Sequence, residues 1–182
     1  MQRFDKDALV AECLAAVRSE GNAPGAVNEI VQRAVSEPAT IEREVRPWSE
    51  SPMMTVWHRS DELTALHIVW PPEVDLFAHD HNMWAVIGIY GGREDNIFWR
   101  KIKDHPDGLI EAAGARALTT GDTCPMGPDI IHSVTNPIPR LTAALHVYGG
   151  DFFEAERSEW DSENLHEHPI DIEQVKARFS PD

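Results

Sequence analysis

The chain has 182 residues, with 31 Asp and Glu against 16 Lys and Arg, and its formal net charge is −15. Domains commonly span about 100–200 residues, so we expect a single domain over 1–182. The acidic excess argues against nucleic acid and against an anionic membrane surface as partners. It favours a small molecule, or a protein, instead.

Cysteine content and apolar runs indicate the compartment. Only Cys13 and Cys124 occur, which is too few for a disulfide scaffold and typical of a reducing cytosol. The first twenty residues carry charges throughout and lack the apolar centre of a secretory signal. No stretch approaches the roughly 18 apolar residues that a membrane span needs. We therefore expect a cytoplasmic protein.

Helical spacing of apolar residues marks the N-terminal region, 1–40. The first pattern covers 5–19, where Asp5 can act as N-cap, and a second helix follows a turn rich in Gly and Pro. Both apolar stripes predict packing against a core. A short closing helix is expected at 171–179, within a polar C-terminal extension, 151–182.

Residues 50–150 have a different character. Their segments are short, rich in Val, Ile, Trp and Thr, and separated by Pro, Gly and Asp turns. Nine strands are predicted, at 53–58, 63–70, 76–81, 83–91, 96–103, 110–118, 122–126, 131–135 and 141–148. Many short strands at this spacing predict a β-sandwich or a β-barrel.

Three histidines form the main chemical signal. His79 and His81 are two residues apart, so on a strand both imidazoles point to the same face. His132 lies on a later predicted strand, after a Gly- and Pro-containing turn that returns the chain to the barrel. Three neutral imidazoles could bind one metal ion and leave coordination positions open. Three separate core histidines are the alternative interpretation. A second pair, at 166 and 168, lies in a polar segment and is expected to be solvated.

This arrangement resembles the two motifs of the cupin superfamily. The second motif consists of a Gly, a Pro-x-Gly, a His and an Asn, which are here Gly121, Pro125, Gly127, His132 and Asn136. The first motif contains the His-x-His pair and then a Glu, but here Ala85 and Val86 occupy the position of the Glu. The resemblance implies a mainly β protein with a double-stranded β-helix, or jelly roll.

Loss of the Glu leaves three histidines, as in the cysteine dioxygenase group of thiol dioxygenases. In Trp57-His58-Arg59, the Arg is similar to the residue of that group that pairs with the substrate carboxylate. In Leu145-His146-Val147-Tyr148, the His and Tyr are similar to the catalytic pair of the group. The resemblance covers 57–148. It implies an iron(II) enzyme, although zinc, nickel or manganese would also suit imidazole ligands. Cupins are often dimers, so the resemblance also implies a possible homodimer.

The expected substrates are dioxygen and a small thiol that bears a carboxylate, of the cysteine or 3-mercaptopropionate class, with a sulfinate as product. Two residues depart from the group: Ala144 replaces the Ser that precedes the His-x-Tyr, and Val86 replaces a Cys that cross-links to the Tyr in animal enzymes. The missing Ser keeps two alternatives open. One is a non-redox metal-dependent cupin, such as a lyase or isomerase. The other is a ligand-binding or sensory cupin without turnover.

Overall fold

The computed structural model describes residues 3–19, 21–45 and 51–179. Its helices in those ranges are α1 (Lys6–Arg18), α2 (Ala23–Val35), α3 (Pro38–Glu44) and α4 (Ile172–Ala177). Its strands there are β1 (Met53–Arg59), β2 (Thr64–Trp70), β3 (Asp75–Asp80), β4 (Ala85–Gly91), β5 (Arg93–Lys101), β6 (Ile110–Thr119), β7 (Thr123–Met126), β8 (Ile131–Thr135), β9 (Thr142–Tyr148), β10 (Ser158–Trp160) and β11 (Glu167–Pro169). None of these helices has the length and apolar character that crossing a membrane requires.

The nine predicted strands correspond to β1 through β9, with small differences at their ends. Strands β10 and β11 and helix α3 were not predicted. Each of the two strands has only three residues, and both lie in a polar segment without alternation. Their pairing comes from β3, because β10 adds to its edge.

The strands form two antiparallel sheets, of order β1-β2-β9-β4-β7 and β11-β10-β3-β8-β5-β6. The central pairings are nested: β5 pairs with β6, β4 with β7, β3 with β8, and β2 with β9. Successive pairs alternate between the two sheets, as in a jelly roll. The predicted double-stranded β-helix is therefore confirmed.

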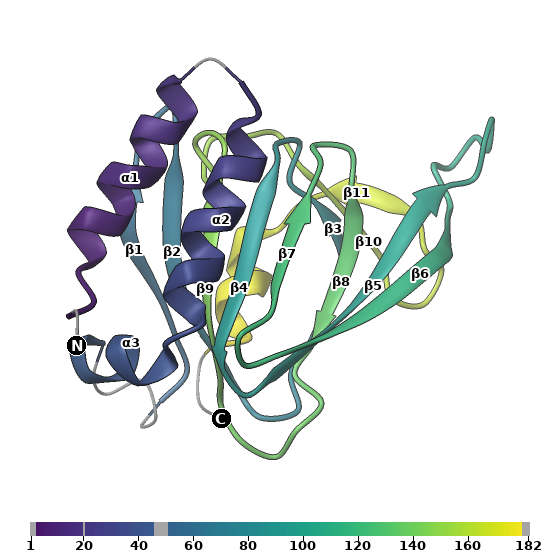
Figure 1. Cartoon of the computed structure of the whole chain (residues 1–182). Helices are drawn as coiled ribbons and strands as arrows, with labels where there is room; N and C mark the ends of the chain where they lie inside the picture. Colours follow the sequence, from purple (N-terminus) through teal and green to yellow (C-terminus); the bar gives the residue numbers. More distant parts are fainter. Residues whose placement is uncertain (1–2, 20, 46–50, 180–182) are drawn as a thin grey trace.

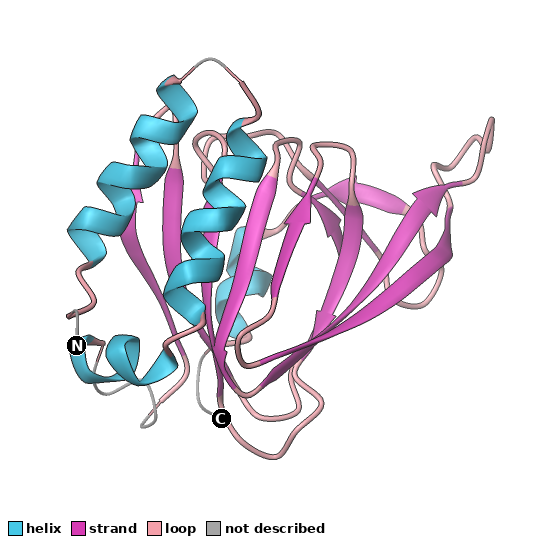
Figure 2. Cartoon of the chain, in the orientation of Figure 1, coloured by secondary structure: helices cyan, strands magenta, loops and turns pink. Residues whose placement is uncertain are grey.

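The N-terminal helices cover the outer face of the first sheet, and Figures 1 and 2 show α1 and α2 lying across β1, β2, β9 and β4. Helix α2 approaches β4 at Gly88, where an added Cβ would lie 2.4 Å from Val31 Cγ1 and 3.0 Å from Val35 Cγ1. Gly88 thus lets the helix reach the sheet. The helical layer leaves the inner face of the barrel free for a separate core.

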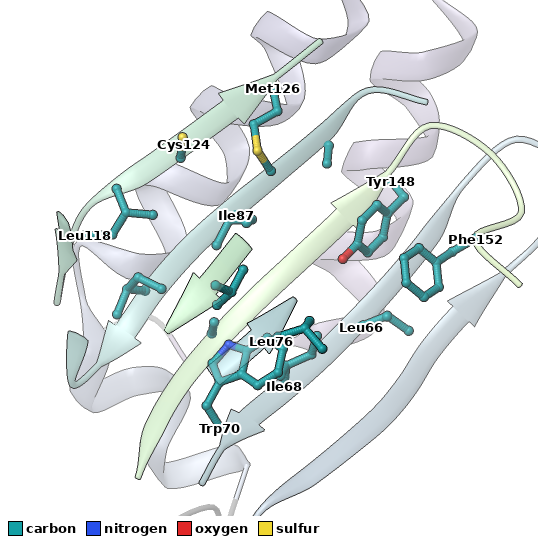
Figure 3. Packing of buried hydrophobic residues seen from close by; sticks show 14 of the residues in the cluster. Leu66, Ile68, Trp70, Leu76, Ile87, Leu118, Cys124, Met126, Tyr148 and Phe152 are labelled. Carbon is teal, nitrogen blue, oxygen red and sulfur yellow. The ribbon is translucent and has the colours of Figure 1, made fainter. Parts of the chain in front are cut away.

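That inner core lies between the two sheets and takes residues from both. Figure 3 shows Leu66, Ile68, Trp70 and Tyr148 on the same face of their sheet, with Phe152 beside Tyr148. The rings of Tyr148 and Phe152 have centroids 4.3 Å apart. Aromatic packing of this kind holds side chains in defined positions.

Two residues of the second cupin-like motif maintain turns. Gly121 has φ +94°, a conformation that other residues rarely adopt, and its N–H donates to the Ile89 carbonyl. The side chain of Asn136 donates to the carbonyls of Pro71 and Arg140. These contacts hold the turns that lead into β7 and out of β8.

The packing at Gly88 gives a test of the helix–sheet contact. Gly88→Ala should lower the free energy of unfolding by about 1–3 kcal/mol, because its methyl group would overlap the valines of α2. Gly114→Ala is the matched control, since a Cβ there meets nothing within 4 Å. Urea denaturation measures both. Equal stabilities of the two variants would contradict this close contact.

Candidate metal centre

The three predicted ligands come together inside the barrel. His79 on β3 is the cross-strand partner of His132 on β8, and His81 follows the end of β3. All three are buried, and each offers a ligand nitrogen within 4.8 Å of the others. The cluster could therefore hold a metal ion.

An irregularity in β3 turns these histidines inward. Leu76 is opposite Val134 and His79 is opposite His132, so β3 contains one more residue than β8 over this stretch. In a regular strand, Leu76 and His79 would point to opposite faces, yet both line the same cavity. Bulges that redirect side chains are common next to functional sites. His81, two residues on, faces the cavity as well.

Hydrogen bonds orient two of the imidazoles. Nδ1 of His79 lies 3.0 Å from the Phe77 carbonyl oxygen, and Nδ1 of His132 lies 2.7 Å from Asn96 Oδ1. Both oxygens are acceptors, so each Nδ1 carries the hydrogen and each Nε2 is free to bind a metal ion. Nε2 of His81 and Nε2 of His132 are 3.3 Å apart. With metal–nitrogen bonds of about 2.1 Å, two ligands in a tetrahedral or octahedral site lie roughly 3.0–3.4 Å apart, so this pair fits a metal ion.

Burial also sets the protonation state. It lowers the pKa of His79 to about 4. It also lowers the pKa of His81 and His132 well below 6.5, and neighbouring histidines lower both further. The three imidazoles are thus neutral at pH 7, which is the form that binds metals.

The cluster faces a small cavity of about 30 Å³. A water molecule needs roughly 10–15 Å³, so this space suits a metal ion with very small ligands. Much of the wall is apolar, and part of it comes from the C-terminal segment through Ile170, Ile172 and Val175. Phe179 extends this cover by stacking on Trp70, with centroids 5.0 Å apart. A larger substrate can enter only when side chains of the wall move.

The predicted catalytic pair lines the same cavity. Nδ1 of His146 lies 3.0 Å from the hydroxyl oxygen of Tyr148, whose ring centroid is 5.0 Å from that of His81. Burial raises the pKa of Tyr148, so its hydroxyl stays protonated at neutral pH. Ala144 has no group that could hydrogen-bond to His146. Instead, Oε2 of the buried Glu94 lies 3.7 Å from His146 Nε2.

The structure places Arg59 away from this cavity. Its guanidinium pairs with Asp151 at 2.9 Å and with Glu154 at 2.7 Å, and it lies over the ring of Phe153. Arg59 is not among the residues that line the cavity. Two carboxylates already neutralise this half-exposed side chain.

A different arginine lines the cavity, and the sequence did not single it out. Arg157 is 5% exposed, and its guanidinium carbon lies 3.9 Å above the ring of Phe152. Within the described ranges it forms no ion pair, and its Nε has no hydrogen-bond partner. Burial lowers the pKa of Arg157, although the nearby Asp80 and Tyr148 favour its charged form.

No sequence pattern marks Arg157, because it lies in the polar extension that follows the predicted barrel. Strand β10 brings it to the site by pairing Glu159 with His79. Glu94 was also missed, since the strand was expected to begin at residue 96. Alternation along β5 could have placed Glu94 and Asn96 on one face had that strand been extended.

The cluster geometry predicts the effect of removing a ligand. His132→Ala should lower the bound metal by more than about tenfold, because even changes in residues that only orient ligands cost about 10–100-fold in affinity. Elemental analysis of the dialysed protein measures the metal, and circular dichroism checks folding. His67→Ala is the control, since His67 is equally buried but lies outside the cluster. Unchanged metal in His132→Ala would remove this residue from the ligand set.

Comparisons with known proteins find distant similarities only. No protein-family model matches the chain. A protein with a double-stranded β-helix domain from Klebsiella pneumoniae subsp. pneumoniae is 14% identical over 72% of this chain and 94% of its own, with a TM-score of 0.44. A cupin-family protein from Methanocaldococcus jannaschii is 11% identical over 60% and 90%, with a TM-score of 0.47. A cupin 2 conserved barrel domain protein from Salinispora arenicola is 17% identical over 59% and 83%, with a TM-score of 0.42.

Similarities at this level say nothing about the reaction. The nested strand pairing and the buried cluster stand on the geometry of the chain itself. The protein therefore has a double-stranded β-helix, or jelly-roll, fold, with three buried histidines that could hold a metal ion.

Proposed function

We propose that the protein is an iron(II)-dependent thiol dioxygenase that oxidises a small thiol bearing a carboxylate group to its sulfinate. The observation that carries this proposal is one small cavity lined by a three-imidazole cluster, a tyrosine–histidine pair and a buried arginine whose Nε has no hydrogen-bond partner. Imidazoles without a carboxylate ligand leave a bound divalent ion with its full positive charge. Such a site favours an anionic thiolate.

The buried guanidinium supports the substrate class. A buried charge without a partner is costly, and a carboxylate is its best partner because two parallel hydrogen bonds can form. Arg157 has no such partner within the described ranges. A substrate carboxylate would fill this place, and the thiol at its other end would face the histidines. The role expected for Arg59 passes to Arg157 in this proposal.

The reaction joins both oxygen atoms of dioxygen to the substrate sulfur, so a thiolate becomes a sulfinate and no other reductant is consumed. His79, His81 and His132 would hold an iron(II) ion. The ion would supply redox chemistry and would have coordination positions left open for substrate and dioxygen. The hydroxyl group of Tyr148 would donate a hydrogen bond either to the reacting groups or to His146 Nδ1. The apolar wall would exclude water.

Oxygen uptake tests the activity directly. The protein is purified without oxygen, its metal is assayed, and uptake is followed with cysteine, 3-mercaptopropionate and thiols that lack a carboxylate. We expect iron-dependent uptake with one of the carboxylate thiols and a matching amount of sulfinate by mass spectrometry. Iron-loaded protein without thiol-dependent uptake would contradict the proposal and leave the lyase, isomerase and binding alternatives.

The two arginines give a sharper test of substrate recognition. Arg157→Gln should raise the KM for a carboxylate thiol by at least about tenfold, because truncating one partner of a buried charge pair costs about 2–5 kcal/mol. It should affect a thiol without a carboxylate much less. Arg59→Gln is the matched control and should leave both KM values nearly unchanged, since Arg59 is paired outside the cavity. The reverse result would restore Arg59 as the carboxylate partner.

A further inference from the structure

Glu94 is a fully buried acid that lies between two hydrogen-bonded pairs of the site. One pair is Asn96 with His132, and the other is His146 with Tyr148. The exposure of Glu94 is 0%, and the residue lies on β5. Oε1 accepts from Asn96 Nδ2 at 3.0 Å, and Oε2 accepts from Trp70 Nε1 at 2.8 Å. Oε2 also faces His146 Nε2 at 3.7 Å. An acid buried this completely is rare unless its oxygens have partners, so its contacts deserve an explanation.

The contact with Asn96 determines which way the amide points. The amide nitrogen of Asn96 faces Glu94 and donates to its Oε1, since an amide NH₂ group is a donor and a carboxylate oxygen is an acceptor. The amide oxygen then faces His132 Nδ1, at 2.7 Å. Because an amide oxygen only accepts, the hydrogen of His132 must sit on Nδ1. This leaves Nε2 of His132 free and directed at the cluster.

The reversed amide would produce the opposite result. Its nitrogen would donate to His132 Nδ1 and move the imidazole hydrogen to Nε2, where it would block metal binding. The amide oxygen would then face a carboxyl oxygen, which is repulsive. Trp70 cannot relieve this conflict, because its indole N–H is a donor only.

We propose that Glu94 is a positioning residue of the metal centre, which acts through Asn96 to hold His132 in the tautomer that presents Nε2 to a metal ion. The proposal rests on the metal-binding part of the function above and not on thiol oxidation. The same carboxyl group lies 3.7 Å from His146 Nε2, on the other ring nitrogen from the one that faces the Tyr148 hydroxyl. Glu94 therefore hydrogen-bonds to Asn96 on one side and faces His146, without a hydrogen bond, on the other.

Exchanging donor and acceptor between two residues tests this chain of contacts. In Glu94→Gln, the new amide can keep its oxygen toward Trp70 and must then turn its NH₂ group toward Asn96. Two donors face each other there, so the Asn96 amide reverses and His132 changes tautomer. In the double variant Glu94→Gln/Asn96→Asp, the glutamine NH₂ donates to one aspartate oxygen while the other accepts from His132 Nδ1. The original tautomer is thereby restored.

Long-range ¹H–¹⁵N correlation spectra of the metal-free protein report the tautomer of each histidine. We expect His132 to carry its hydrogen on Nδ1 in the wild type and in the double variant, and on Nε2 to a large extent in Glu94→Gln. The wild-type spectrum already tests the proposal without any substitution. A hydrogen on Nε2 of His132 in the wild type would overturn it.

Titration with Co²⁺ gives a second, independent reading. Glu94→Gln should weaken Co²⁺ binding by about 10–100-fold, and the double variant should recover most of this loss. Asp80→Asn is the control for removing a buried acid near the cluster, because the Asp80 side chain accepts from the Ser158 N–H and touches neither Asn96 nor His146. Equal losses in Glu94→Gln and Asp80→Asn, or no recovery in the double variant, would contradict a positioning role.

Neither measurement uses a thiol or dioxygen. Failure of the dioxygenase assay with the expected tautomers would leave the role of Glu94 intact. A working dioxygenase with unchanged tautomers in Glu94→Gln would refute that role alone.

Discussion

The pairing of β3 with β8, including the extra residue between Leu76 and His79, is the constraint on which the site depends. In a β-strand, a shift of one residue moves every following side chain to the other face. The bulge therefore decides that His79 and His81 point into the barrel. The partner strand then places His132 directly opposite His79. Without this local register, the same three histidines would not share a cavity.

Burial determines the protonation state of the histidines near the β3–β8 pairing and the cost of leaving polar groups there without partners. The interior favours neutral imidazoles over charged ones, so the histidines are ready to bind a metal ion without losing protons. Burying a polar group without a hydrogen-bond partner costs free energy, so each such group in the interior calls for a physical reason. Glu94 has partners for both oxygens, whereas Arg157 has none for its Nε among the described residues. The hydrogen bonds of Glu94 are thus satisfied within the protein, whereas Nε of Arg157 is not.

The site contains two layers of polar contacts with different tasks. Backbone and amide oxygens at Phe77 and Asn96 orient the imidazoles of His79 and His132. Around the cavity, Tyr148, His146 and Arg157 face the space that a small ligand would occupy. Glu94 joins the layers, since it contacts Asn96 on one side and faces His146 on the other. The residue where the resemblance implies a serine is Ala144, and the nearest carboxyl group to His146 Nε2 among the described residues is that of Glu94, at 3.7 Å.

The strand pattern and the three clustered histidines could be predicted from the sequence because they depend on local periodicity. Alternation placed His79 and His81 on one face, and the turn residues from Gly121 to Gly127 indicated the return of the chain toward His132. The surroundings of the two arginines were harder to predict. Arg59 lies on a predicted strand next to familiar-looking residues, yet its guanidinium is paired with Asp151 and Glu154. Arg157 lies in a segment without periodicity, and it reaches the cavity only because β10 adds to the edge of β3.

The sequence by itself determined the β-rich architecture, the N-terminal helices and the identity of the three histidines, because these follow from short-range spacing and turn chemistry. Only the tertiary structure decided which charged groups face the metal centre and how its hydrogen bonds run. Those features depend on contacts between residues far apart in the chain, such as His132 with Asn96 and Arg157 with Phe152. Such contacts arise when distant strands become neighbours, and no local pattern in the chain encodes that proximity.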